Sequence, residues 1–149
     1  MNGMRIEKIT KQNITELASL MLEMWEDSLF EKAYEDCKRI LASETETCFL
    51  VKDQDIYIAF VYLSLRHDYV EGAKTHPVGY MEGLYVKSAY RNRGIGKNLV
   101  KAGETWCKEQ GCTEFASDTE TSNTDSQLFH KNVGFKEINR IVCFHKELK

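Results

Sequence analysis

The chain has 149 residues, of which 42% are hydrophobic and 29% are charged, and its formal net charge is −3. This length and composition are typical of a single domain over residues 1–149 with a real hydrophobic core. The weak negative charge argues against nucleic acid as a partner, because nucleic-acid-binding proteins present a basic surface. A mildly acidic surface suits a cationic ligand better.

The cysteines and the N-terminus indicate where the protein works. The five cysteines are odd in number and irregular in spacing, which favours reduced thiols in a cytoplasmic protein over a disulfide framework. They lack the spacing of a zinc site, so we expect no metal. The N-terminus has no signal-peptide core, and no run of about 18 apolar residues predicts a membrane span.

In chain order, the apolar periodicity first predicts a strand and two helices. Residues 5–9 alternate as a short strand does, and a helix from Ile14 ends near Trp25. A second helix covers about residues 30–41, and the break at 25–28 between the helices is a candidate functional loop. The face of the second helix that we expect to be buried consists of Phe30, Tyr34, Cys37 and Leu41.

The middle of the chain predicts three strands. Residues 47–52 and 56–66 are separated by a short polar turn and indicate an antiparallel hairpin. A third strand covers residues 78–86 and contains Gly79 and Gly83. Glycine inside a strand often marks a bulge or the close approach of another segment.

The last third of the chain predicts a helix from about residue 95 to Gly111, a strand at 114–117 and a helix at 124–133. One or two final strands follow at 136–148. No clear turn divides this last segment, so a final strand is expected to pair with a second subunit and to form a homodimer.

The segment RNRGIGKNLV (91–100) holds Gly94 and Gly96 at a predicted helix start. Such glycines let backbone N–H groups approach a phosphate. The segment is not a Walker A loop, because Asn98 stands where that loop needs Ser or Thr, and Leu99 replaces the third glycine of a dinucleotide fingerprint. The remaining pattern suits a pyrophosphate, although a tight turn alone would also use the two glycines.

These features together resemble the Gcn5-related N-acetyltransferase (GNAT) family along nearly the whole chain. The interrupted strand at 78–86, Arg91-x-x-Gly94-x-Gly96, Asn123 and LFHKNVGF (128–135) follow one another in that family's order. The resemblance implies a mixed, mostly antiparallel central sheet flanked by helices, with acetyl-CoA as cosubstrate. It assigns the pantetheine arm to the backbone of Leu84, Tyr85 and Val86 and to Asn123, and the pyrophosphate to the amides of Asn92, Arg93, Gly94, Ile95, Gly96 and Lys97.

The acceptor is indicated by a narrower resemblance. Residues 66–72, 76–86 and 112–118 are similar to those of the aminoglycoside 6'-N-acetyltransferases, whose activity confers antibiotic resistance. An aminoglycoside is a polycation, so its pocket needs carboxylates and aromatic surfaces. By this resemblance the substrate contacts are Trp25, Tyr69, Glu82, Asp118 and Asn139, and Asn139 stands where close relatives have an acidic residue.

Several of these residues also have a structural interpretation. Trp25 could belong to the core, and Asp118 could cap a turn. Glu82 is the hardest to explain structurally, because an unpaired carboxylate inside an apolar strand is costly. We therefore predict Glu82 as the general base and Asp118 as the group that positions the amine, with their roles open to exchange.

Two departures from the family's pattern, Phe129 and the Asn139 already named, keep other functions open. Many relatives have a tyrosine proposed to protonate the leaving thiolate, but this chain has Phe129 at that position. His130 is expected to point about 100° away around the helix. The alternatives are acetylation of another amine, such as a polyamine or a protein N-terminus, and a non-catalytic acetyl-CoA-binding module.

Overall fold

The computed structural model describes residues 3–149 of the chain. Within these residues five strands form one sheet in the order β1-β2-β3-β4-β5, and only the β4–β5 pair is parallel. This confirms the predicted mixed, mostly antiparallel sheet. The strands are β1 (Met4–Lys8), β2 (Glu46–Asp53), β3 (Ile56–Arg66), β4 (Val78–Val86) and β5 (Phe115–Ser117).

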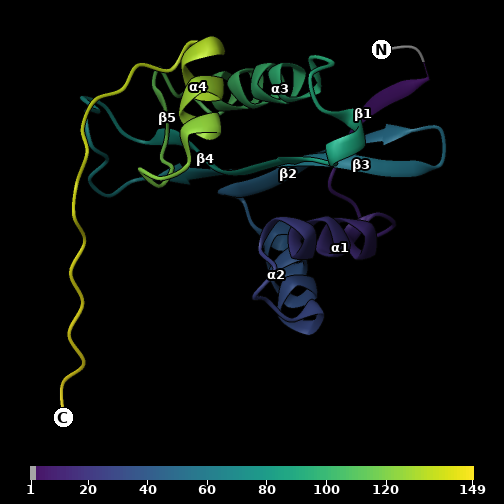
Figure 1. The fold of residues 1–149 in the computed structure, drawn as a ribbon, viewed down its shortest axis with the longest axis horizontal. Helices are drawn as coiled ribbons and strands as arrows, with labels where there is room; N and C mark the ends of the chain where they lie inside the picture. The colour runs from purple at the N-terminus through teal and green to yellow at the C-terminus, as the bar shows by residue number, and fades with distance from the viewer. Residues whose placement is uncertain (1–2) are drawn as a thin grey trace.

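Helices cover both faces of the sheet, with α1 and α2 on one side and α3 and α4 on the other (Figure 1). Each face has its own buried core, one between α3 and the sheet and one between the α1–α2 pair and the sheet. The helices are α1 (Ile14–Met24), α2 (Phe30–Ala42), α3 (Ile95–Glu109) and α4 (Thr124–Asn132), with a single 3₁₀ turn at Ser88–Tyr90. None of the helices in residues 3–149 is both long and apolar enough to span a membrane.

The predicted interruption of β4 is a β-bulge at Glu82. Tyr62 of β3 pairs with Gly83, whereas the next residue, Leu63, pairs with Met81, so Glu82 is the extra residue on β4. A bulge of this kind bends its strand and redirects a side chain.

The two glycines of β4 allow close approach from both faces of the sheet. A Cβ atom on Gly79 would collide with Cys107 of α3, and one on Gly83 would lie 2.7 Å from the indole of Trp25. Larger residues at either position would therefore push a helix away from the strand that carries Glu82.

The buried face of α2 differs from the predicted one. Ala33, Cys37 and Ile40 are buried, while Phe30 is exposed and Tyr34 lies at the edge of the core. Phe30 and Tyr34 stack on each other, and Tyr34 also packs against the core cluster that contains Ala33. The prediction was right for Cys37, which is buried, and for Tyr34 and Leu41, which are partly buried against this core, but wrong for Phe30. Apolar character alone does not locate the contact face of a short helix.

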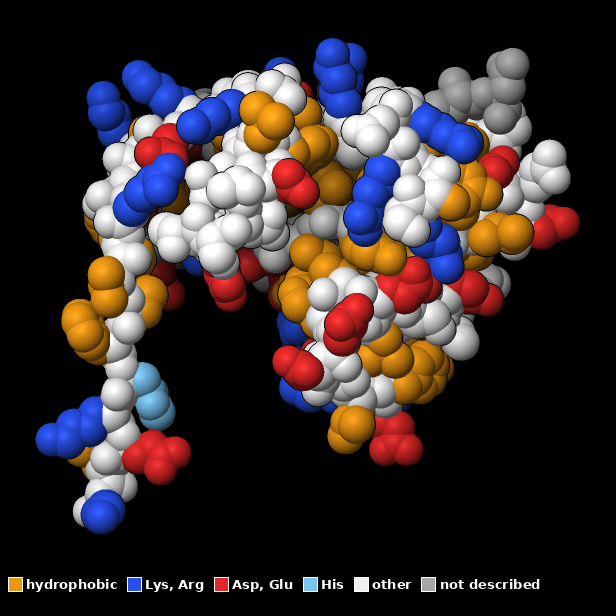
Figure 2. Space-filling view, in the orientation of Figure 1, with side chains coloured by type: hydrophobic (Ala, Val, Ile, Leu, Met, Phe, Trp, Pro, Cys, Tyr) orange, Lys and Arg blue, Asp and Glu red, His pale blue; other side chains and the backbone are white. Residues whose placement is uncertain are grey.

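The prediction of final strands at 136–148 was also wrong for the chain by itself. Residues 136–149, all of them described, form neither helix nor strand, and the segment extends away from the sheet (Figure 1). Hydrophobic side chains are exposed along it (Figure 2). They are Ile138, Ile141, Val142, Phe144 and Leu148.

Candidate active site

A cavity of about 190 Å³ opens between β4, the end of β5, the end of α1 and α4. It brings together four of the predicted site residues, Glu82, Leu84, Asp118 and Asn123. The other lining residues are Met24, Met81, Gly83, Ser117, Thr119, Ser126, Phe129 and His130.

The cavity exists because β4 and β5 separate. They pair only from Gly79–Phe115 to Met81–Ser117, after which β4 continues and β5 ends. Leu84, Tyr85 and Val86 pair with β3 on one side, and within residues 3–149 no strand pairs with their other edge. This leaves backbone groups of β4 available to an extended ligand, as in β-strand addition.

Glu82 is held by donors from β3. Arg66 donates from Nε to Oε2 at 3.0 Å and from Nη2 to Oε1 at 2.8 Å, and Ser64 Oγ donates to Oε2 at 2.6 Å. Both oxygens of the carboxylate therefore already accept hydrogen bonds. The Glu82 side chain remains 23% exposed, so it is still open to the cavity.

Asp118 accepts a hydrogen bond from the hydroxyl of Tyr80, a buried residue of β4. Burial, followed by this hydrogen bond, raises the pKa of Tyr80 above its ordinary value, which keeps the phenol protonated as a donor. The Arg66 guanidinium lies 3.4 Å from the centre of the Tyr80 ring. Neither Arg66 nor Tyr80 was predicted from the sequence, although Ser64 and Arg66 follow the alternation of one strand face.

The glycine loop leads into the N-terminus of α3. Gly94 is the N-cap residue with φ +82°, a conformation that favours glycine, and no atom lies within 4 Å of the Cβ position. The first amides of α3 have no partner within the helix, so they and the helix dipole can bind an anion. Arg91 donates from Nε to the Val86 carbonyl at 2.8 Å, which ties the loop to the end of β4.

Gly96 has a packing role in addition to the predicted one. A Cβ atom there would lie 2.9 Å from the ring of Phe129, so the missing side chain lets α4 pack against the start of α3. Asn123 is the N-cap of α4 and accepts from the Ser126 amide at 3.0 Å. The side-chain oxygen of Asn123 therefore has a structural function as well.

His130 lines the same cavity as Phe129, which the expected angle between them had not indicated. Its Nδ1 lies 2.7 Å from the Ser126 carbonyl, and its Nε2 lies 2.8 Å from Ser117 Oγ. Because a carbonyl only accepts, Nδ1 carries a proton, and the ring is fixed against the end of β5.

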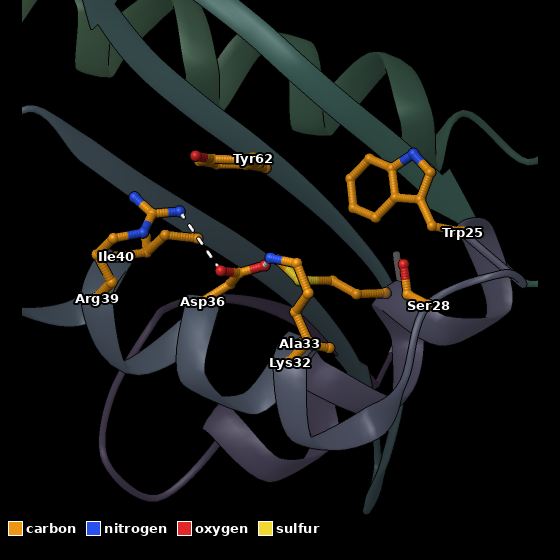
Figure 3. A pocket seen from close by; sticks show the side chains of 9 residues that line it. Trp25, Ser28, Lys32, Ala33, Asp36, Arg39, Ile40 and Tyr62 are labelled. Atoms are coloured by element: carbon orange, nitrogen blue, oxygen red, sulfur yellow. Dashed lines mark hydrogen bonds and ion pairs between the residues drawn. The ribbon is translucent and has the colours of Figure 1, made fainter. Parts of the chain in front are cut away.

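Trp25 is the C-cap of α1 and does not line this cavity, although the preceding residue Met24 does. The Trp25 indole lies over Gly83, directly beside Glu82, and is 38% exposed, so Trp25 is not simply a core residue. A second cavity of about 70 Å³ lies between α1, α2 and β3, and Trp25 and Tyr62 form part of its wall (Figure 3). Its charged residues, Lys32, Asp36 and Arg39, pair with one another.

Tyr69 and Asn139 do not line the main cavity. Tyr69 is 81% exposed and donates from its hydroxyl to Glu71 at 2.6 Å, and the Asn139 amide donates to the same carboxylate. The bond from Tyr69, then that from Asn139, holds the pKa of Glu71 below its ordinary value. The structure thus brings these two predicted residues together around an exposed negative charge.

The described residues offer no cluster of metal ligands. No three His, Cys, Asp or Glu side chains in the described part of the chain are grouped to hold a metal ion. All five cysteines are free thiols, and burial raises the pKa of Cys37 and of Cys107 to about 12.

The sequence and the fold are both similar to those of known proteins. A family model described as the acetyltransferase (GNAT) family matches residues 11–135. An aminoglycoside N(6')-acetyltransferase type 1 of Serratia marcescens is 36% identical over 137 residues, which cover 91% of this chain and 94% of the relative. The corresponding protein of Salmonella enteritidis is 33% identical, with 96% and 99% covered.

Among solved structures, AAC(6')-Iy in complex with the bisubstrate analogue CoA-S-monomethyl-acetylneamine has a TM-score of 0.94 and 32% identity, covering 97% of this chain and 99% of that one. AAC(6')-Ih from Acinetobacter baumannii has a TM-score of 0.92 and 32% identity, with 99% and 100% covered. The sheet order, the separation of β4 from β5 and these matches lead to one assignment. The chain belongs to the acetyltransferase (GNAT) family and, within it, to the aminoglycoside N(6')-acetyltransferases.

Proposed function

We propose that this protein transfers the acetyl group of acetyl-CoA to the 6'-amine of aminoglycoside antibiotics and thereby confers resistance to them. The observation that carries the proposal is the meeting of two carboxylates, Glu82 and Asp118, in one cavity beside the unpaired edge of β4. The two relatives described above are named as aminoglycoside N(6')-acetyltransferases. One of the similar solved structures contains the bisubstrate analogue CoA-S-monomethyl-acetylneamine.

The residues around this edge fit acetyl-CoA. The backbone of Leu84, Tyr85 and Val86 is suited to pair with the pantetheine arm, with Asn123 across the cavity. The loop from Asn92 through Lys97 offers amides to the pyrophosphate, and the open space at Gly94 leaves room for it. Acetyl-CoA supplies the acetyl group as a thioester, and this chain's residues bind and orient both reactants.

The two carboxylates have complementary functions. A substrate amine is protonated near neutral pH, and only its neutral form can attack a thioester. We assign proton removal to Glu82, directly or through a water, and attraction and positioning of the ammonium to Asp118. Trp25 provides an aromatic surface against Gly83, the residue after Glu82, and Tyr69 and Asn139 contact other parts of the drug around the Glu71 charge.

The extended C-terminal segment supports a homodimer. Among residues 3–149 β5 pairs with β4 alone, so its outer edge is free, and residues 136–149 expose a set of apolar side chains. Pairing this segment with a second copy would cover both the edge and the apolar side chains. We place the enzyme in the cytoplasm, where acetyl-CoA is available and cysteines stay reduced.

The first test measures thiol release from acetyl-CoA with three acceptors, namely kanamycin, spermidine and a peptide with a free N-terminus. We expect turnover with kanamycin only. An aminoglycoside with a hydroxyl in place of the 6'-amine is the matched control and should give no product. Preferred turnover of spermidine or the peptide would assign the protein to another acceptor, and no turnover with any amine would indicate a binding module.

The second test separates the carboxylates. Glu82→Gln should lower kcat by about 10²–10⁴-fold, the usual effect of losing a general base. Asp118→Asn should act mainly on KM, because a lost positioning contact weakens substrate binding. Steady-state kinetics with kanamycin gives both constants. If both variants had the kcat and KM of the unaltered enzyme, neither carboxylate would take part in binding the aminoglycoside or in the reaction.

The third test concerns the glycine loop. Gly94→Val should weaken acetyl-CoA binding at least about tenfold, because its side chain would enter the space left for the pyrophosphate. Gly111→Val is a matched control, because Gly111 follows the other end of α3, has φ +87° and also has no atom within 4 Å of its Cβ position. Calorimetry should show normal affinity for the control. Equal affinities for both variants would contradict the loop assignment.

The fourth test concerns the dimer. Sedimentation of the unaltered chain should give a dimer at micromolar concentration, and Val142→Glu together with Phe144→Glu should give a monomer, because both side chains lie on one face of an extended strand. A single His145→Glu change on the other face is the control and should leave the dimer intact. A monomeric unaltered chain would contradict the proposal.

A further inference from the structure

Arg66 is the only guanidinium that contacts Glu82 in the described part of the chain, and it does so with two donors. The Nε and Nη2 atoms lie 3.0 and 2.8 Å from the two carboxylate oxygens. A planar fork of this kind fixes the orientation of a carboxylate as well as neutralising it. Ser64 adds a third donor from the same strand, so the position of Glu82 is set by β3.

Arg66 also reaches the second carboxylate through Tyr80. The central carbon of the guanidinium lies 3.4 Å from the centre of the Tyr80 ring, and the Tyr80 hydroxyl donates to Asp118. The hydrogen bond to Glu82 raises the pKa of Arg66 above its ordinary value despite partial burial, and the charges of Glu82, Tyr80 and Asp118 act in the same direction. Among the described residues, these three are the titratable groups that act most strongly on Arg66.

We propose that Arg66 is a positioning residue that holds both carboxylates and also favours the neutral, reactive form of the substrate amine. The inference rests on the proposed acetyl transfer at this cavity. The site holds two negative charges and one fixed positive charge before the substrate arrives. A bound ammonium is attracted by the carboxylates but repelled by Arg66, so the neutral form of the amine is more populated than it would be beside the carboxylates alone.

The two functions of Arg66 can be separated by substitution. Arg66→Lys keeps the charge but loses the planar fork, whereas Arg66→Gln loses the charge and keeps a polar side chain. Loss of the charge should move the rising limb of the kcat–pH profile to higher pH by about one unit, since Arg66 is 39% exposed and its field is partly screened. KM for the aminoglycoside should fall or stay constant, because the ammonium loses a repulsive neighbour.

The experiment measures kcat and KM against pH for the unaltered enzyme, both Arg66 variants and Arg5→Gln. Arg5 pairs with Glu7 on β1 through Nε alone, on the exposed edge of the sheet and away from the cavity, so its variant should match the parent. Arg66→Lys should lower kcat about tenfold or more without shifting the rising limb of the kcat–pH profile. Arg66→Gln should shift that limb to higher pH. Unchanged affinity for acetyl-CoA in each variant shows that the fold is intact.

The outcomes distinguish the inference from the function on which it rests. If the unaltered enzyme does not acetylate aminoglycosides, the proposed function fails. If it does, and Arg66→Gln lowers kcat with no shift of the pH profile, Arg66 has only a structural role and the inference is overturned. A rise in KM for Arg66→Gln would likewise contradict it, because Arg66 would then be assisting binding of the ammonium.

Discussion

Backbone pairing between β4 and β5 stops at Met81 and Ser117, and the candidate site depends on this early end. Beyond that point β4 offers one edge to β3 and the other to a ligand. The same separation places Asp118, the first residue after β5, opposite the bulge at Glu82. A regular β4 fully paired with a longer β5 would leave neither a cavity nor a free edge, so the proposed cosubstrate site and the proposed acid–base chemistry both depend on the early end of this pairing.

The bulge also connects the chemistry to the rest of the fold. It shifts the β3–β4 register by one residue, and with this register Glu82 meets Ser64 and Arg66. Gly83, directly after the bulge, has no side chain to displace the Trp25 indole, so α1 can end at the cavity. Glycine at position 96 lets Phe129 pack on the start of α3 in a similar way. The cavity walls are therefore held by contacts from both faces of the sheet.

Much of this could be predicted from the sequence, because glycines and alternation are local signals. The bounds of β4, the start of α3 and the glycine loop follow from residues close together in the chain. The partners of Glu82 and Asp118 could not be predicted, since they depend on the register of β3 against β4 and on the end of β5. The conformation of residues 136–149 also could not be predicted, because a run of apolar residues indicates a strand but does not indicate which strand it pairs with. The contact face of α2 was predicted only in part, since the small Ala33 is buried there and Phe30 is exposed.

Amide hydrogen exchange with and without CoA tests most directly whether the free edge of β4 and the start of α3 form one cosubstrate site. The account predicts slower exchange for amides in residues 84–86 and 94–98 when CoA is bound, with unchanged exchange in β1 at the far edge of the sheet. Protection of only one of these two segments, or protection that is uniform over the whole sheet, would contradict it.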